Sequence, residues 1–363
     1  MPRRSRRRTA ATLRALKPRI PSAVPALKSL SRSLWPPPRP PAVPLPVPRR
    51  RGGAPGRWVT DQRTPGLGGR VFDVYLPAGL RRRSRVPMVV LLHGCTQTAA
   101  EFADATRFTT VADRNGFLLV LPHQEPRHHS RRCWRWYESL HQMRGNGEPA
   151  VLAAITRQVA AEEGRWRVDP LRIYVAGLSA GGAMALILAA AYPDLFAAAG
   201  VHSAPPYRAA THGGQALPAM AGRTAVPEPA PGGPAMAPLV VIQGSADDVV
   251  VPLNGERITE QWQAFHAAAA PAGAPTRLGR PRTERGRTAD GRRYTRVRWY
   301  AARRRRVLEY WLIQRLGHAW SGGRSGGSFS DPVGPRASTL MWSFFRTHRL
   351  DRAVDVDGGR RAG

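Results

Sequence analysis

Short apolar runs alternate with longer amphipathic segments along most of the chain, and each kind of segment predicts its own element. Residues 87–93 (PMVVLLH) form an uninterrupted apolar run, which is typical of a parallel strand buried on both faces. Similar patterns predict strands at residues 71–76, 117–121, 172–176, 198–202, 239–243, 295–300 and 308–314. Helices are predicted at residues 102–115 (ended by Gly116), 148–166, 254–268 and 337–346, with an alanine-rich helix that runs to residue 192. This alternation indicates an α/β fold with a mostly parallel central sheet flanked by helices on both faces.

The ends of the chain lack this pattern. Residues 1–57 mix proline runs with thirteen arginines, Lys17 and Lys28, and contain no acidic residue. Such a composition buries too little apolar surface to offset the entropy of ordering, so we expect a disordered basic arm over residues 1–57. Residues 351–363 are polar and glycine-rich and are expected to form a flexible tail. No run of about 18 apolar residues occurs, so no transmembrane segment is expected.

The formal net charge of +32 makes polyanions and anionic membranes candidate partners. A second basic block spans residues 277–306, and the basic residues are almost all arginine. One interpretation is a weak contact of the arm with a polyanion or an anionic membrane surface. The other is compositional, because arginine, alanine, glycine and proline are all favoured by GC-rich coding. Neither interpretation predicts a specific nucleic-acid site.

The strongest chemical signal is the segment Gly177-Leu-Ser179-Ala-Gly181, which lies between an apolar strand and an alanine-rich helix. In that context G-x-S-x-G predicts a nucleophile elbow, a strained turn that holds the serine hydroxyl clear of the sheet. Side chains at either flanking position would collide with neighbouring backbone, and glycine removes both collisions. The helix that follows offers free N–H groups to a developing oxyanion. The chain is therefore predicted to be a serine hydrolase.

A serine nucleophile needs a base and an orienting acid, and in this kind of sheet they follow in the order serine, acid, histidine. Asp247 comes directly after the strand at residues 239–243 and is the preferred acid, with Asp248 as the second choice. Alternatively, either aspartate caps the helix that begins near Asn254. His318 lies on a glycine-flanked loop after a predicted strand and is the preferred base.

The remaining candidates concern the oxyanion hole, the substrate cleft and cofactors. Backbone N–H groups of Ala180 and Cys95 are the expected oxyanion donors, with Gly94 permitting the turn. The aromatic segment at residues 133–137 (CWRWY) either lines an apolar cleft or covers the core. No spacing of histidine, cysteine and acidic residues suggests a metal, and no glycine-rich phosphate loop is present, so no cofactor is expected.

Four segments, in this order, resemble a known family: 91–98 (LLHGCTQT), 177–183 (GLSAGGA), 244–252 (GSADDVVVP) and 317–323 (GHAWSGG). They are similar to the poly(3-hydroxybutyrate) depolymerase family of esterases, relatives of feruloyl and acetylxylan esterases. The resemblance covers about residues 58–350 and implies an α/β-hydrolase catalytic domain there, without metal or organic cofactor. Many such enzymes are secreted, so the resemblance favours an extracellular location; the arm lacks a clear signal peptide, so a cytoplasmic location stays open.

The resemblance also implies roles for particular residues. Ser179, Asp247 and His318 would be nucleophile, acid and base, and Cys95 would donate to the oxyanion. A Cys95–Cys133 disulfide is expected, because such cysteines commonly pair in the family.

The substrate is expected to be an ester. Trp134 and Trp320 are assigned to the substrate cleft. Short-chain polyhydroxyalkanoate polymer or oligomers are the first choice. No separate polymer-binding domain is expected after residue 350. Feruloyl, acetylxylan or general short-acyl esters are the alternative, and a non-catalytic polyanion-binding protein is the lesser one.

Overall fold

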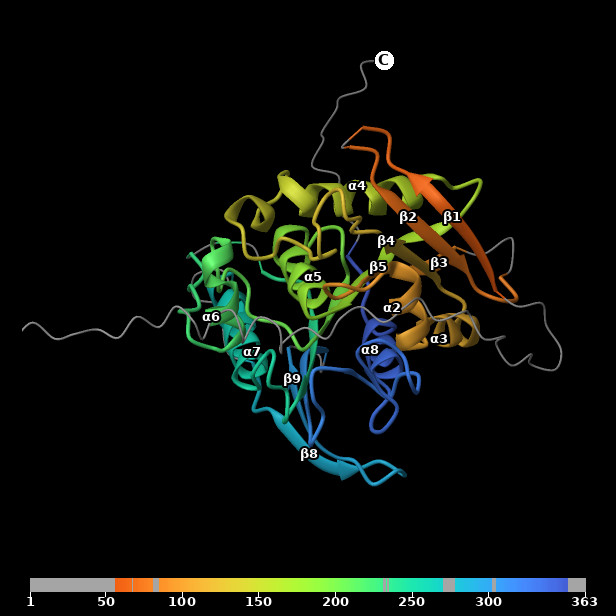
Figure 1. Ribbon diagram of the computed structural model, residues 1–363. Coiled ribbons are helices and arrows are strands. Elements are labelled where there is room, and N and C mark those ends of the chain that lie inside the picture. Colours follow the sequence, from red (N-terminus) through yellow and green to blue (C-terminus); the bar gives the residue numbers. More distant parts are fainter. Residues whose placement is uncertain are drawn as a thin grey trace, which may run out of the picture. The chain divides into compact units, whose positions relative to one another are not determined.

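A ten-stranded sheet runs through the part of the chain that the computed structural model describes, namely residues 56–66, 68–80, 85–230, 233, 235–269, 278–301 and 305–351 (Figure 1). Its order is β1-β2-β4-β3-β5-β6-β7-β10-β9-β8. The strands are β1 (Arg57–Arg63), β2 (Val71–Leu76), β3 (Val86–Leu92), β4 (Leu118–Pro122), β5 (Val168–Leu178), β6 (Ala198–His202), β7 (Leu239–Gly244), β8 (Arg282–Arg287), β9 (Arg293–Tyr300) and β10 (Arg306–Ile313). The predicted basic arm and C-terminal tail lie outside the described residues, apart from Gly56, Arg57 and Asp351.

The centre of the sheet is parallel and its two sides are antiparallel. Strands β4, β3, β5, β6, β7 and β10 pair in parallel, whereas β1, β2, β8 and β9 join by antiparallel pairing. A short second sheet pairs β11 (Trp320–Ser321) with β12 (Ser330–Asp331). The central strands are buried along their length, as their apolar runs predict.

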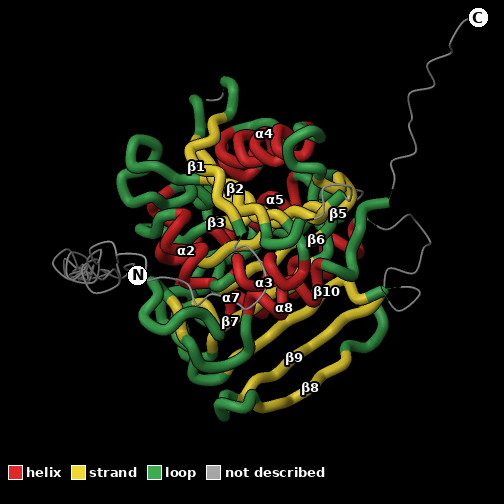
Figure 2. Tube along the Cα trace, turned by 90° about the vertical axis from the view of Figure 1, so that its right-hand side faces the viewer, coloured by secondary structure: helices red, strands yellow, loops and turns green. Residues whose placement is uncertain are grey.

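Helices cover both faces of the sheet (Figures 1 and 2). One face packs against α2 (Ala99–Thr106), α3 (Phe108–Asn115) and α8 (Ala337–Phe345). The other face packs against α4 (Gly147–Ala161), α5 (Ala180–Ala191) and α7 (Leu253–Ala268), with α6 (Ala216–Met220) and the 3-10 turns Ser139–Gln142 and Gly213–Gln215 beside them. The predicted mostly parallel sheet with two helical layers is confirmed. No helix among the described residues is long and apolar enough to cross a membrane.

Two predicted helices have different bounds in the structure. The single helix expected at residues 102–115 is two helices, because Arg107 adopts a left-handed conformation (φ 55°) between α2 and α3. Thr98 caps α2 through a reciprocal capping box with Glu101, so the helix begins three residues earlier than predicted. Gly116 ends α3 with a φ of 70°, as expected.

The helix expected at residues 148–166 ends at Ala161. Beyond it the indole of Trp166 is buried and donates to Glu162 Oε2 at 2.8 Å. In the sequence, this buried tryptophan looks like the last apolar residue of the helix, which is why the predicted helix is too long.

Candidate active site

Ser179 occupies a strained turn between β5 and α5. Its backbone has φ 56° and ψ −120°, and its N–H donates to the carbonyl of His202 at 2.9 Å. A Cβ atom on Gly177 would lie 2.3 Å from the Gly181 carbonyl carbon, and one on Gly181 would lie 2.1 Å from the Leu92 carbonyl oxygen. Neither approach is possible for a residue with a side chain, which is why glycine is required at both positions. The turn has the geometry that the sequence predicts for a nucleophile elbow.

The three residues predicted to act together all follow strands of the parallel centre. Ser179 comes after β5, Asp247 after β7 and His318 after β10, and these strands lie in the order β5-β6-β7-β10. Parallel strands end at the same edge of a sheet, which is where α/β folds build their ligand sites. The topology therefore gathers the nucleophile, acid and base candidates along one edge.

Asp247 and His318 are in direct contact. The imidazole Nδ1 of His318 lies 3.1 Å from Asp247 Oδ1 and 3.0 Å from Oδ2. Asp247 is 3% exposed and also accepts from the backbone N–H groups of Val249 at 3.1 Å and Val250 at 2.8 Å. Asp248, the second choice for the acid, is exposed. The pair fixes Nδ1 as the donor and leaves His318 Nε2 as the nitrogen that can accept a proton.

The charge on Asp247 is stabilised within the site. Burial by itself would raise the pKa of this carboxyl, but the hydrogen bond and positive charge of His318, with the N–H of Val250, outweigh it and hold the pKa below its ordinary value. A carboxylate that stays ionised is suited to orient the imidazole and to stabilise it when it becomes protonated.

Ser179 and His318 are not joined by a hydrogen bond in the described part of the chain. Both residues are almost buried: Ser179 is 7% exposed, and the side chain of His318 is 8% exposed. Hydrogen bonds of this kind are often loose in unliganded enzymes and tighten when substrate binds. The acid–base contact is thus formed, whereas the base–nucleophile contact stays a prediction.

The two predicted oxyanion donors lie on loops that touch each other. Ala180 is the first residue of α5, so its N–H has no partner within the helix. A Cβ atom on Gly94 would lie 3.6 Å from the Cβ of Ser179, which shows how closely the loop before Cys95 approaches the elbow. No acceptor among the described residues takes the Cys95 N–H. The role of the two amides as oxyanion donors stays a prediction.

Gln97 fixes this loop and was not singled out from the sequence. Its buried side chain accepts from the Gly94 N–H at 2.9 Å and donates to the Ser328 carbonyl at 3.0 Å. Ser328 belongs to the segment that follows His318, so one amide joins the candidate oxyanion loop to the histidine loop. The signal in the sequence is a glutamine three residues after Gly94, the spacing of a side chain that closes its own turn.

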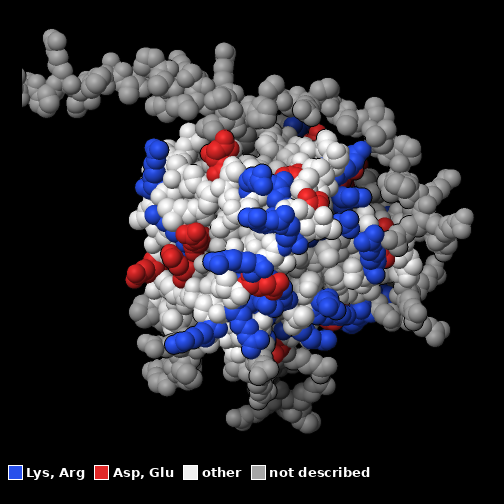
Figure 3. All heavy atoms as spheres, turned by 90° about the horizontal axis from the view of Figure 1, so that it is seen from below, with Lys and Arg blue, Asp and Glu red and all other residues white. Residues whose placement is uncertain are grey.

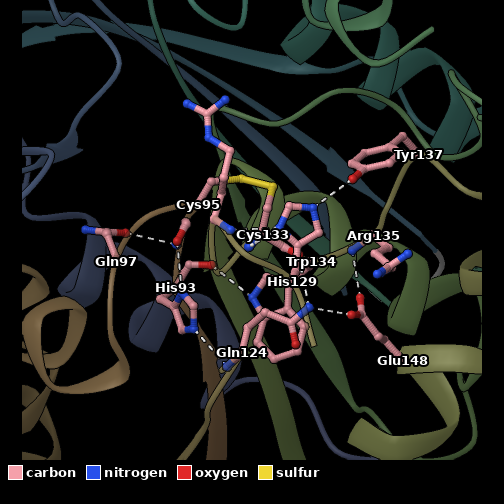
Figure 4. Close-up of a disulfide and its surroundings, with 12 residues drawn as sticks. His93, Cys95, Gln97, Gln124, His129, Cys133, Trp134, Arg135, Tyr137 and Glu148 are labelled. Atoms are coloured by element: carbon pink, nitrogen blue, oxygen red, sulfur yellow. Dashed lines mark hydrogen bonds between the residues drawn. A yellow bond between two sulfur atoms is a disulfide. The ribbon is translucent and has the colours of Figure 1, made fainter. Parts of the chain in front are cut away.

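A disulfide joins Cys95 to Cys133, as the family resemblance implies (Figure 4). Behind it lies a buried polar cluster centred on Glu148, which accepts from the side chain of Gln124 at 2.5 Å and from the Arg135 N–H at 2.7 Å. Burial raises the pKa of Glu148 despite these hydrogen bonds and the nearby arginines. The cluster holds the segment around Cys133 against the Cys95 loop.

The two tryptophans predicted to line a substrate cleft lie inside the core. Trp134 is 2% exposed and its indole N–H donates to the carbonyl of His93 at 3.0 Å (Figure 4). Trp320 is fully buried, packs against Phe102 and donates to the Ser338 hydroxyl at 3.1 Å. Both rings stabilise the loops around the site from behind, and neither offers a surface to substrate.

Two other histidines near the site are buried and neutral. Burial lowers the pKa of His93 to about 4, although its Nδ1–H donates to the Gly94 carbonyl at 2.8 Å. Burial lowers the pKa of His202 to about 3, with the charge of Asp247 opposing the shift and that of His318 adding to it. The His202 Nε2 accepts from the Ser321 N–H at 3.3 Å. Both rings are hydrogen-bonded structural elements.

These histidines predict acid sensitivity of the fold. Each has a folded-state pKa below the 6.5 of the free side chain, so protons bind the unfolded chain first. Their contribution is fully present above about pH 6.5 and is lost as the pH falls toward 4 for His93 and 3 for His202. We expect the free energy of unfolding to fall by up to about 1.4 kcal/mol per pH unit for each histidine.

Urea unfolding between pH 7 and pH 4.5 measures this slope. The exposed His212→Gln variant is the control and keeps the wild-type slope. A free energy of unfolding that stays constant over this range contradicts the burial of neutral histidines.

No group of three or more histidine, cysteine or acidic side chains in the described ranges is placed to hold a metal ion.

Comparisons with known proteins place the chain in a family of esterases. Residues 70–285 match the family described as Esterase PHB depolymerase. The chain is 33% identical over 208 residues to poly(3-hydroxyalkanoate) depolymerase C of Paucimonas lemoignei, which covers 53% of this chain and 47% of that protein. It is 31% identical over 131 residues to feruloyl esterase B of Neurospora crassa, covering 36% and 42%. The chain thus spans about half the length of these relatives.

A solved structure supports the fold. Acetyl xylan esterase from Aspergillus awamori superposes with a TM-score of 0.59 and 18% identity, covering 81% of this chain and all of that chain. At that identity the likeness concerns the fold alone, and it confirms the expected α/β-hydrolase architecture.

Proposed function

Because the chain belongs to the Esterase PHB depolymerase family, we propose that it is a serine esterase whose nucleophile is Ser179. The observation that carries the proposal is the hydrogen-bonded Asp247–His318 pair, which lies at the same edge of the sheet as the strained Ser179 turn. An acid that orients a histidine, beside a serine on an elbow, is the arrangement that activates a hydroxyl for attack on an ester.

The proposed reaction proceeds in two halves. His318 Nε2 takes the proton of the Ser179 hydroxyl as the serine oxygen attacks the ester carbonyl carbon. The N–H groups of Ala180 and Cys95 donate to the oxyanion that forms. His318 then gives its proton to the departing alcohol oxygen, which leaves an acyl group on Ser179. Water, deprotonated by His318, attacks this acyl group, and the serine recovers its proton as the acid leaves.

Esters of short hydroxyalkanoate chains, as polymer or oligomers, are the proposed substrates. The support is the family match together with the depolymerase among its relatives. A feruloyl or acetylxylan ester is the second candidate, because feruloyl esterase B and acetylxylan esterases are also similar to this chain. A purely polyanion-binding role would depend on the arm, which lies outside the described residues.

A substrate panel tests the proposal. The full chain is assayed on p-nitrophenyl butyrate, 3-hydroxybutyrate oligomers, methyl ferulate and acetylated xylan at matched concentration. Hydrolysis of the butyrate ester and the oligomers with the highest kcat/KM is the expected result. A higher kcat/KM on ferulate or xylan acetate would assign the second candidate, and absence of turnover on all four would refute an esterase.

A further inference from the structure

A basic pocket lies at the end of the sheet formed by β8, β9 and β10, which run side by side in Figure 2. Its volume is about 610 Å³, within the range of small-molecule sites. The lining residues are Arg285, Gly286, Asp290, Gly291, Arg292, Arg293, Tyr294, Thr295, Gln314, Arg315 and Val333. Four arginines against one aspartate give this pocket a strongly positive character. The face of the molecule seen in Figure 3 likewise shows more basic than acidic side chains.

Only one of the four arginines has an acidic partner. Arg292 Nη2 lies 2.7 Å from Asp331 Oδ2. For Arg285, Arg293 and Arg315, no carboxylate of the described residues lies within ion-pairing distance. These three guanidinium groups are the charges that an anionic ligand would meet.

On the opposite face of the same strands, two arginines are paired with carboxylates. There Arg298 Nη2 pairs with Glu284 at 3.0 Å, and Arg296 Nε pairs with the buried Glu309 at 2.9 Å.

The pocket is held in shape by its own hydrogen bonds. Arg292 Nη1 donates to the carbonyls of Gln314 at 3.1 Å and Arg315 at 2.7 Å. Asp290 accepts from the Gly334 N–H at 2.8 Å and from the Thr288 hydroxyl. The hairpin turn is thereby fastened to the end of β10. A rigid frame lowers the entropy that ligand binding costs.

The pocket adjoins the segments that carry the candidate acid and base. Arg315 precedes His318 by three residues, so their Cα atoms lie at most about 11 Å apart. The Arg315 N–H donates to the Ser245 hydroxyl at 2.9 Å, and Ser245 precedes Asp247 by two residues. The pocket and the candidate base therefore lie on neighbouring segments at one edge of the sheet, and an oligomer of several units is long enough to extend from the pocket to Ser179.

We propose that this pocket binds the free carboxylate of a hydroxyalkanoate oligomer whose ester bond lies at Ser179. This inference rests on the proposed esterase function. Guanidinium groups bind carboxylates through paired N–H donors, and three unpaired arginines around one cavity supply them. The pocket would make the enzyme prefer oligomers with an acidic end over neutral esters of the same acyl group.

Binding to the full chain tests the pocket without turnover. Calorimetric titration compares 3-hydroxybutyrate with its neutral counterpart 3-hydroxybutyramide. The acid is expected to bind and the amide is not. The single variants Arg285→Gln and Arg293→Gln should each weaken the acid about tenfold, the effect of losing one charge-assisted hydrogen bond. Arg315→Gln, on a different element, should weaken it similarly. Arg282→Gln removes an exposed charge of the same strand outside the pocket and should change nothing.

Two results of this titration would overturn the proposal. The first is equal binding of acid and amide, or equal binding by the wild type and the pocket variants. The second is inorganic phosphate binding as tightly as 3-hydroxybutyrate, which would indicate a phosphate site.

Kinetics separate this inference from the esterase function. The linear 3-hydroxybutyrate tetramer is compared with its terminal amide, because β5 and β10 lie three strand spacings apart, about 14 Å, which is farther than a dimer spans. The wild type should show a kcat/KM for the acid about ten times that for the amide, and the pocket variants a ratio near one. A ratio near one in the wild type overturns the pocket while leaving the esterase intact. Failure to hydrolyse either compound rules out hydroxyalkanoate substrates, and the titration then decides the pocket alone.

Discussion

Replacing Ser179 with alanine is expected to lower kcat for p-nitrophenyl butyrate by about six orders of magnitude. Only the oxyanion donors and substrate binding would remain to accelerate the reaction. The Ser179 hydroxyl makes no hydrogen bond with the described residues, and alanine fits the same turn. The free energy of unfolding should therefore change by less than about 1 kcal/mol. Initial rates and urea unfolding of the same preparation measure both quantities.

A matched serine provides the control. Ser139 is exposed, and its hydroxyl contacts only the carbonyl of Thr211 at 3.2 Å. Ser139→Ala should keep the wild-type kcat. If Ser179→Ala retains more than about 1% of the wild-type rate with its fold intact, the hydrolysis uses another nucleophile.

Replacing Asp247 with asparagine is expected to reduce kcat by about four orders of magnitude. Asparagine retains the shape but not the charge, so the histidine loses the partner that fixes its tautomer and stabilises its protonated form. The neighbouring Asp248→Asn variant removes the same charge one residue away, on an exposed side chain that does not touch His318. Its kcat should equal that of the wild type.

The two aspartate variants decide between the candidates in one experiment. Measuring kcat for both on p-nitrophenyl butyrate is sufficient. A large loss in Asp248→Asn together with little loss in Asp247→Asn would exchange their roles. Equal small losses would remove the acid from the mechanism.

Much of the site can be predicted when local structural rules are applied to the sequence. Gly177 and Gly181 are required wherever a strand turns sharply into a helix, because backbone atoms come within 2.3 Å of a Cβ position there. Apolar runs identify buried strands, and parallel strands end at one edge. Asp247 and His318 each follow such a strand, which is why their meeting is predictable over 71 residues of separation.

Other features depend on contacts between distant segments. Strands β1 and β8 are largely exposed and polar, so they carry no apolar alternation and were not predicted. The sequence also does not distinguish an aromatic residue that lines a cleft from one that is buried in the core. Trp320 is buried because Phe102 and Ser338 receive its ring and its N–H, and neither partner is adjacent in the sequence. The break at Arg107 is similar, since nothing in that residue type demands a left-handed backbone.

The identity of the nucleophile is the claim on which the rest depends, and covalent labelling tests it most directly. The full chain is incubated with a fluorophosphonate, which forms a stable bond with an activated serine, and is then digested and analysed by mass spectrometry. We expect one adduct, on the hydroxyl of Ser179, and we expect its formation to be suppressed in His318→Ala. An adduct on a different serine, or labelling of Ser179 at the same rate without His318, would contradict it.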